Sequence, residues 1–329
     1  MAVGGRADNP GGLSMPECRA SVPAMSDENT VTFYLHAKLR RQAEAGQHNF
    51  IAKLTEVLTG AGLQVAFDDD GDAARLRAIG RPGHSLHLME EPPTTRGLTF
   101  RRTYIYPFWH IEKQAKRWEW PVAQAPFDAT AQDPIKAGNF YRFWQNRLFD
   151  DAPAAATRDG FIYVPLQGRL TTQRSFQSSS PIDMVQAVLD HDADRQIMVT
   201  LHPSEDYSLA EQDALEALVN QNDRLNVRSG GMERYLKGCD YVVTQNSGVG
   251  FMGYFFGKPL ILFGQSDFHH IALNVRDIGV AEAFARAPDH APDYAAYLFW
   301  FLQKRAINAG RPEALQKIRN VLRGHGWPV

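Results

Sequence analysis

Three short polar segments of this sequence carry residues that could bind a phosphate group. Each follows an apolar run of strand length, and the candidate contacts are Gln167, His202 and the turn Asn246, Ser247, Gly248, Val249 and Gly250. A glycine-containing turn that leads into a helix presents unpaired backbone N–H groups and the positive end of the helix dipole. These residues therefore predict phosphate binding. The alternative is that Ser247 and the glycines form only an N-cap and a tight turn, with His202 in a structural role.

The second half of the chain alternates apolar strands with helices, which would bring these segments to one edge of a sheet. Ser180 and Pro181 supply an N-cap and a first-turn proline, and Ser208 with Glu211 forms a capping box. Apolar strands separated by helices indicate a parallel sheet covered on both faces, whose ligands bind beyond the carboxyl ends of the strands. Strands are predicted at Phe161–Val164, Ile197–Leu201, near Val227, Tyr241–Thr244 and Leu260–Phe263, and helices from Ser180 through Leu189, after Ser208, at Met232–Lys237 and at Gly248–Phe256.

The first half also begins as strand, helix and strand. Val31–Leu35 and Leu63–Phe67 are predicted strands on either side of a helix at Asn49–Leu58, and a further strand is predicted at Ser85–Met89. From Phe100 to Trp144 the pattern is aromatic and predicts partly helical structure. The predicted class is α/β, with a disordered tail at 1–29, an N-terminal domain at 30–155, a C-terminal domain at 156–290, and C-terminal helices at 291–329 that can pack back across the domains.

The composition excludes several classes of protein. Apolar residues at 44% and aromatic residues at 11% are enough for sizeable cores. The 35 Lys and Arg against 37 Asp and Glu give a net charge of -2, so no overall field attracts nucleic acid or acidic lipid. No window supplies the run of about 18 apolar residues that a membrane helix needs. Cys18 and Cys239 are too few for a disulfide framework, which favours a cytoplasmic protein.

Taken together, the three polar segments resemble the capsule polysaccharide biosynthesis family, which includes bacterial Kdo transferases of capsule export. The resemblance covers about residues 161–273 and rests on Tyr163 to Gln167, His202-Pro203, Val242 to Gly250 and Gly257-Lys258-Pro259, with Gly264 and Phe268 also matching. It implies a GT-B glycosyltransferase with two Rossmann-like domains facing a cleft. His202 and the turn after Asn246 would then hold the phosphate of a nucleotide sugar without a metal. The chain departs from the family at Met252, where a glutamate usually faces the donor ribose, and also at Gly253 and near Thr200.

In GT-B enzymes the N-terminal half supplies the acceptor site and the catalytic base. His36, Glu90 and Glu91 each follow a predicted strand and are candidate bases, with ordinary surface positions as the alternative. The segment Arg101 to Trp120 mixes basic and aromatic residues that suit an anionic glycan or glycolipid, and the candidate contacts are Arg101, Arg102, Trp109, Lys113 and Arg117. The alternative is a helix with its aromatic residues packed inward. No cluster has metal-ligand spacing, so neither a metal nor another cofactor is expected.

The predicted function is transfer of a sugar, such as Kdo or a related acidic sugar, from a nucleotide donor to a cell-surface polysaccharide or glycolipid. Two alternatives stay open. One is another GT-B enzyme, such as a nucleotide-sugar epimerase or a polyol-phosphate transferase. The other is a non-catalytic glycan-binding or assembly subunit, which Met252 favours. No nucleic-acid partner is expected, and membrane contact is at most peripheral, at the inner face.

Overall fold

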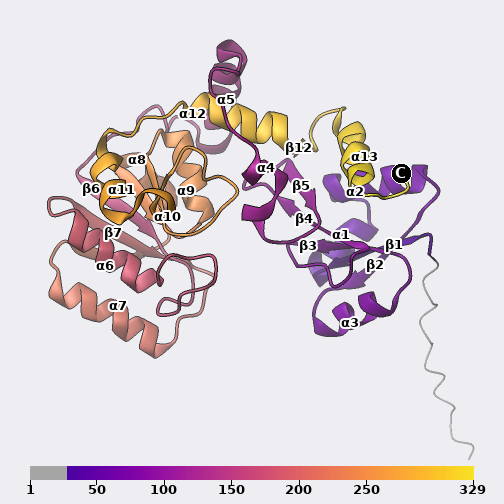
Figure 1. The fold of residues 1–329 in the computed structure, drawn as a ribbon, viewed down its shortest axis with the longest axis horizontal. Coiled ribbons are helices and arrows are strands. Elements are labelled where there is room, and N and C mark those ends of the chain that lie inside the picture. The colour runs from indigo at the N-terminus through magenta and orange to yellow at the C-terminus, as the bar shows by residue number, and fades with distance from the viewer. Residues whose placement is uncertain (1–27) are drawn as a thin grey trace, which may run out of the picture.

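The chain builds two six-stranded sheets, each covered by helices. The computed structural model describes residues 28–329, so the predicted tail lies outside the described residues except for its last two. Figure 1 shows the two sheets side by side, with helices joining them. The strand orders are β12-β5-β4-β3-β1-β2 and β11-β10-β9-β6-β7-β8.

The first sheet is parallel at its centre and antiparallel at one edge. β1 (Thr30–Leu35) pairs in parallel with β2 (Gln64–Asp69) and β3 (His84–Leu88), β4 (Gly97–Arg102) extends the parallel part, and β5 (Phe108–Glu112) runs antiparallel to β4. Side chains of a strand alternate between its two faces. Phe33 therefore faces a core with α1 (Ala37–Glu44) and α2 (Asn49–Gly60), whereas Tyr34 faces α3 (Asp72–Gly80).

The second sheet is parallel throughout, and its order reverses at the centre. From β6 (Phe161–Pro165), β7 (Gln196–Leu201) and β8 (Leu225–Ser229) are added on one side, and β9 (Tyr241–Thr244), β10 (Leu260–Leu262) and β11 (Leu273–Asn274) are added on the other side. Val164 faces a core with α6 (Pro181–His191), α7 (Leu209–Gln221) and α11 (Val280–Arg286). Tyr163 faces the opposite side, with α8 (Met232–Gly238) and α9 (Gly248–Gly253). The order reverses between β6 and β9.

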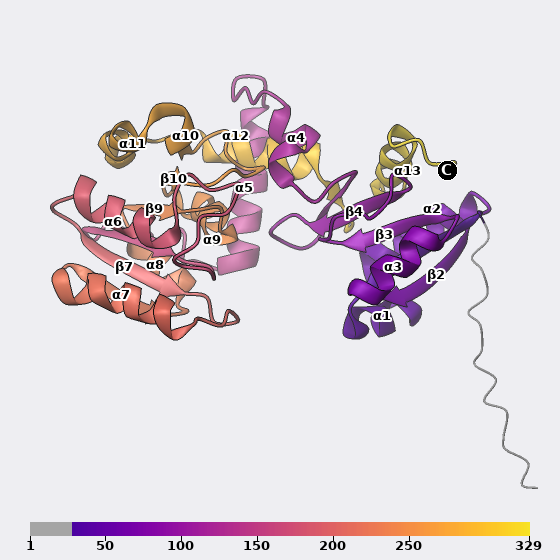
Figure 2. The ribbon, with the colours of Figure 1, turned by 60° about the horizontal axis from the view of Figure 1, so that its bottom comes forward.

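Two crossings of the chain connect the sheets. α5 (Pro134–Phe149) leads from the first sheet to the second, and α12 (Tyr294–Leu298) continues into the π-helical segment Phe299–Arg305, which leads back. β12 (Ile307–Asn308) then pairs antiparallel with β5, and α13 (Ala314–Gly324) packs against α2 (Figure 2). The first unit is thus completed by the last residues of the chain. The remaining short helices are α4 (Pro121–Gln124), α10 (Val275–Ile278) and the 3-10 turns Arg117–Glu119, Tyr254–Phe256 and Ala287–Asp289.

The two units share one aromatic cluster. The Tyr104 ring of the first unit stacks on Phe251 with centroids 4.5 Å apart and meets Phe268 edge-on at 5.0 Å. The Tyr141 hydroxyl on α5 donates to the Tyr254 carbonyl at 2.9 Å. Because this contact buries apolar surface from both units, it holds them in a defined arrangement.

Most predicted elements are confirmed, including every strand and helix predicted in the second half. Both hydrogen bonds of the Ser208–Glu211 capping box are present. The α/β class, with parallel sheets covered on both faces, is confirmed. The prediction for residues 100–144 is wrong in part, because this segment completes β4 and forms β5 before α5 begins. Across residues 28–329, no helix has the length and apolar character needed to span a bilayer.

Candidate functional site

The polar segments after β6 and β9 meet where the order of the second sheet reverses. Such a switch point is where parallel α/β sheets form a ligand crevice. The Thr244 hydroxyl at the end of β9 donates to the Pro165 carbonyl at the end of β6, at 3.0 Å, which ties the two strand ends together. Asn246 and Ser247 are buried just beyond β9, and Gln167 is half-buried beyond β6. The structure therefore brings these three predicted residues to one edge.

Ser247 caps α9. Its hydroxyl accepts from the Val249 N–H at 3.2 Å, and its carbonyl accepts from the Gly250 N–H at 3.0 Å. Gly250 packs tightly, because a Cβ there would lie 3.0 Å from Leu260. A Cβ on Gly248 would lie 3.3 Å from the Tyr104 ring, so the first unit covers this turn from one side. The turn is thus a packed helix start at the boundary between the units, in agreement with the N-cap alternative, and its phosphate role stays a prediction.

His202 lies beyond β7 at the same edge and is exposed. Its backbone N–H donates to the Tyr207 hydroxyl at 2.9 Å, and its Nδ1 accepts from the Ser204 N–H at 3.2 Å. The bond to Nδ1 orients the imidazole, and Nε2 takes part in neither hydrogen bond. β7 is separated from β9 by β6, so two strand spacings, about 10 Å, lie between the His202 and Ser247 strands. His202 therefore shares an edge with the turn, and its hydrogen bonds are to Ser204 and Tyr207 rather than to the turn.

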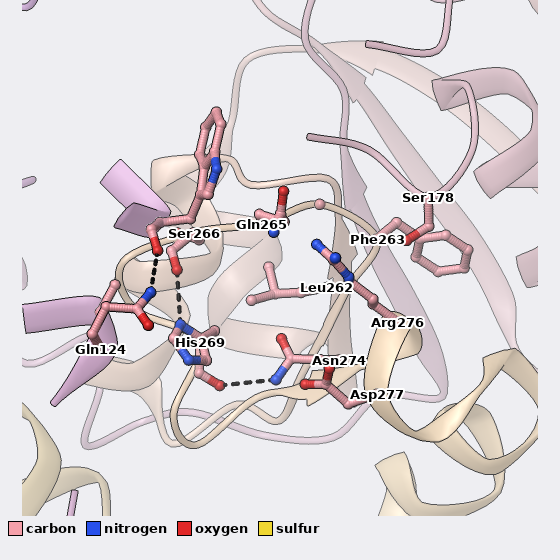
Figure 3. Close-up of a pocket in the computed structure, with 13 residues that line it drawn as sticks. Gln124, Ser178, Leu262, Phe263, Gln265, Ser266, His269, Asn274, Arg276 and Asp277 are labelled. Atoms are coloured by element: carbon pink, nitrogen blue, oxygen red, sulfur yellow. Dashed lines mark hydrogen bonds between the residues drawn. The ribbon is translucent and has the colours of Figure 1, made fainter. Parts of the chain in front are cut away.

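A pocket of about 370 Å³ lies beyond the carboxyl ends of β10 and β11 (Figure 3). Trp118, Ala123 and Gln124 line it from the first unit, and Gln265 and His269 line it from the second. The His269 Nδ1 lies 2.8 Å from the Ser266 carbonyl, and the Asn274 amide donates to the His269 carbonyl at 3.3 Å. Figure 3 shows Arg276 directed into this space. Amide, imidazole and guanidinium groups beside an indole can hydrogen-bond and stack on a flat heterocycle.

This pocket was not predicted from the sequence. The Asn246 side chain connects it to the β9 turn, because its Nδ2 donates to the Gln265 carbonyl at 3.1 Å. Gly264 was a sequence feature that could have indicated the pocket. A Cβ at this position would lie 2.9 Å from the Gln245 carbonyl, so the close approach of the two segments requires glycine. Trp118 lies within the aromatic and basic segment Arg101 to Trp120, but its place opposite Arg276 could not be predicted, because the pocket forms only when distant segments fold together.

A buried ion pair joins the two units next to this pocket. Arg117 Nη1 lies 3.1 Å from Asp267 Oδ1, and the Tyr104 hydroxyl hydrogen-bonds to both side chains. Burial lowers the pKa of the Arg117 guanidinium to about 10, and Asp267 opposes that effect. Arg117 is only 9% exposed, so its predicted contact with an acceptor is wrong. It is a structural residue of the interface because its charge is already paired inside the protein.

The other predicted acceptor residues do not form one surface. Trp109 is 4% exposed and stacks on Phe50 at 4.5 Å in the core of the first sheet, so its ring cannot stack on a sugar and that prediction is wrong. Arg102 and Lys113 are exposed. Arg101 is half-buried, and burial lowers the pKa of its guanidinium although Asp267 acts to raise it.

The three candidate bases lie at the edge of the first sheet, in different settings. His36 caps α1, with its Nδ1 accepting from the Leu39 N–H at 3.4 Å. Glu91 accepts from the Ala115 N–H at 2.7 Å. Glu90 lies 3.6 Å from Arg75 and lines a pocket of about 280 Å³ together with Tyr34 and His87. Only Glu90 lines this pocket, and all three roles stay predictions.

Met252 is half-buried on α9 and packs against the aromatic cluster that the two units share. Its position beside a donor stays a prediction. Over the range 28–329, no group of three or more His, Cys, Asp or Glu side chains is placed to hold a metal ion.

Comparisons with known proteins add a family and a fold. The family model "Capsule polysaccharide biosynthesis protein" matches residues 130–311, more than half of the chain. A Thermosulfurimonas dismutans KpsC structure, a beta Kdo 2,7 transferase, is 13% identical with a TM-score of 0.50, covering 89% of this chain and 99% of that one. A second KpsC structure from that organism, a beta Kdo 2,4 transferase, is 11% identical with a TM-score of 0.45, covering 83% and 90%.

A UDP-GlcNAc 2-epimerase from Methanocaldococcus jannaschii is 8% identical with a TM-score of 0.39, covering 90% of this chain and 99% of its own. No curated protein sequence gives a significant match. The likeness to the first KpsC structure, together with the two covered sheets, confirms the predicted two-domain GT-B fold.

Proposed function

Because the chain belongs to the capsule polysaccharide biosynthesis family, we propose that it is a glycosyltransferase acting on a nucleotide-sugar donor and an anionic glycan or glycolipid acceptor. The observation that carries the proposal is the pocket of Figure 3, which lies beyond strand ends of the second sheet and is walled by Trp118 of the first unit. The nucleoside would occupy this pocket. Its phosphates would extend toward the β9 turn, which Asn246 connects to the pocket wall. The proposal keeps the cytoplasmic location expected from the sequence.

The chemistry required is the separation of a sugar from a nucleotide phosphate. The bond from the anomeric carbon to the phosphate oxygen breaks, the acceptor oxygen bonds to that carbon, and the acceptor proton passes to a base. Donors that are held in place before the reaction stabilise the negative charge that develops on the phosphate. His202 and the turn containing Ser247 are the proposed donors, and Glu90 is the proposed base because it lines a pocket at the edge of the first sheet. We propose that no metal takes part.

An acidic sugar such as Kdo is the proposed donor sugar. Arg174, in the loop between β6 and α6, has two buried guanidinium nitrogens, Nε and Nη2, without hydrogen-bond partners among the described residues. The same loop reaches the pocket, because the Gln265 N–H donates to the Phe176 carbonyl at 2.8 Å and Ser178 lines the pocket wall. A carboxylate would pair well with the free N–H groups of an arginine.

Calorimetric titration with CMP, CDP, UDP and GDP tests the nucleotide site. We expect one nucleotide to bind, and Arg276→Ala to weaken its binding by about 1.5 to 3 kcal/mol, the range for hydrogen bonds to charged groups. Arg286→Ala removes an exposed arginine elsewhere and should leave the affinity unchanged. The absence of binding by all four nucleotides would overturn the proposal and favour a non-catalytic subunit.

A transfer assay then separates the enzymes that share this fold. Transfer of an acidic sugar from its nucleotide to a glycan or glycolipid acceptor is the expected result. An epimerised donor, or transfer of a polyol phosphate, would identify one of the other GT-B activities. Treatment with EDTA should leave transfer intact, and a loss that Mg²⁺ or Mn²⁺ restores would contradict the metal-free proposal.

A further inference from the structure

A groove lined by aromatic and basic side chains lies away from the pocket of Figure 3. We call it the α5 groove: α5, the π-helical segment Phe299–Arg305, β12 and the Tyr106-Pro107 loop enclose about 860 Å³. Its lining includes four aromatic side chains of the two helical segments, Phe140, Phe143, Trp144 and Phe299. Figure 1 shows α5 at the top of the molecule, outside both sheets.

The apolar groups at this groove are unusually open to solvent. Phe143 is 56% exposed and Tyr106 is 48% exposed, and both line the groove. Ile135, in the first turn of α5, is 74% exposed. Two large, exposed apolar side chains that line the same groove indicate a surface suited to contact with another molecule.

The charged side chains that line the groove are all basic. Lys136, Arg147 and Arg311 line it, no acidic side chain does so among the described residues, and α5 as a whole carries no Asp or Glu. Lys136 has an exposed partner, Asp133, at 3.4 Å. Within residues 28–329, Arg147 and Arg311 form no ion pair. Lys304 adds a further cation 5.5 Å from the Phe299 ring centroid. The groove therefore complements a molecule that is apolar at one end and negatively charged at the other.

We propose that the α5 groove binds an anionic phospholipid of a bilayer, with an acyl chain along the aromatic floor and the headgroup phosphate at Arg147 and Arg311. A cationic helix that exposes large apolar side chains is suited to lie in the interface of an anionic membrane. Aromatic side chains are likewise favoured at the level of the headgroups. The protein then docks with α5 toward the bilayer, although none of its described helices crosses it. This inference does not depend on the proposed transfer reaction, because lipid binding needs neither substrate.

Sedimentation of the full chain with vesicles tests the headgroup site. We expect binding to vesicles of three parts phosphatidylcholine and one part phosphatidylglycerol, and none to phosphatidylcholine alone. The double variant Arg147→Ala with Arg311→Ala should bind about thirtyfold more weakly, since each basic side chain near an anionic bilayer contributes about fivefold. The matched control, Arg228→Ala with Arg286→Ala, removes two exposed arginines of the second unit and should bind as the native chain does. Equal losses in both double variants would overturn the site.

Quenching of tryptophan fluorescence by brominated acyl chains tests the apolar part. Trp144 lines the groove, so bound vesicles should quench the native chain, and Trp144→Phe should remove most of the quenching. Phe143→Ser should weaken binding without unfolding, because that side chain is mostly exposed. Binding without quenching, or full displacement by inorganic phosphate, would overturn the acyl site.

Absence of vesicle binding with intact nucleotide binding would overturn the docking surface alone, and an acidic protein partner would then be the better occupant.

Discussion

The carboxyl edges of the two sheets are built from different chemistry. At the first sheet, carboxylates dominate and are exposed: Arg40 pairs with Asp69 at 3.1 Å, and Arg75 with Glu90 at 3.6 Å. At the second sheet, the neutral side chains of Gln245, Asn246 and Ser247 are buried. Exposed ion pairs are weak, so their side chains can change partners. Buried hydrogen-bonded side chains are instead held in one orientation.

This difference agrees with the two roles proposed above, donor binding at the second sheet and acceptor chemistry at the first. The edge of the second sheet is preorganised, as a site for one defined ligand requires. Ser247 and Asn246 are each held by hydrogen bonds, and the turn packs against Tyr104. The edge of the first sheet keeps hydrated carboxylates that can adapt to a larger ligand. Four predictions test the contrast, and the first concerns the ion pair that joins the two units.

Arg117→Ala should lower the free energy of unfolding by about 3 to 5 kcal/mol, because it leaves Asp267 buried without its cation. Urea denaturation measures the change. Glu282→Ala removes an exposed partner of Arg286 and should cost about 0.5 kcal/mol or less. Arg117→Met with Asp267→Leu should recover much of the loss. A change below about 1 kcal/mol for Arg117→Ala would mean that the pair does not hold the units together.

One histidine in each unit, the buried His87 and the half-buried His270, should make stability depend on pH. Burial lowers the pKa of His87 to about 4, with a further contribution from Arg75, and burial with His269 lowers that of His270 to about 4. The unfolded chain therefore binds more protons between pH 6.5 and 4, so stability is retained above this window and falls as the pH drops through it. Each histidine should contribute a loss of up to about 3 kcal/mol.

Urea denaturation at several pH values measures the slope for each unit. His87→Gln and His270→Gln should each flatten the dependence of stability on pH within the window. An unchanged slope in one variant would show that its histidine does not titrate as a buried neutral group.

His202→Ala and Ser247→Ala should each weaken nucleotide binding by about 1 to 3 kcal/mol, if these residues contact the donor phosphate. Ser247→Ala also removes an N-cap and should cost about 1 kcal/mol of stability. Ser208→Ala removes the cap of α7 and should cost a similar amount with no effect on binding. Nucleotide affinity that is unaltered in both site variants would remove the phosphate role from this edge.

Met252→Glu tests whether the face of α9 that carries this residue belongs to the site or to the core. Since the side chain packs against the shared aromatic cluster, we expect a loss of stability of about 1 kcal/mol or more and no change in ribose preference. Parallel melting and titration with ribo- and deoxyribonucleotides measure both effects. Selective tightening of ribonucleotide binding would instead support the position beside the donor that the sequence predicts.

The sequence predicted the second sheet well because its signals are local. Apolar strand runs, the Ser180-Pro181 helix start and the Ser208–Glu211 capping box all lie within a few residues of the structure they specify. The polar segments after β6 and β9 could also be placed at one edge, since the carboxyl ends of parallel strands coincide. The family resemblance rested on these same segments.

Only the tertiary structure decided the features that depend on distant residues. β5 pairs with β12, and Trp109 enters the core that this pairing completes, although its neighbours in sequence suggested a sugar-binding surface. Arg117 is neutralised by Asp267 rather than left free for an acceptor. Sequence pattern and composition indicate which chemistry a side chain can perform. Whether that side chain is buried or exposed depends on residues from distant parts of the chain that pack against it.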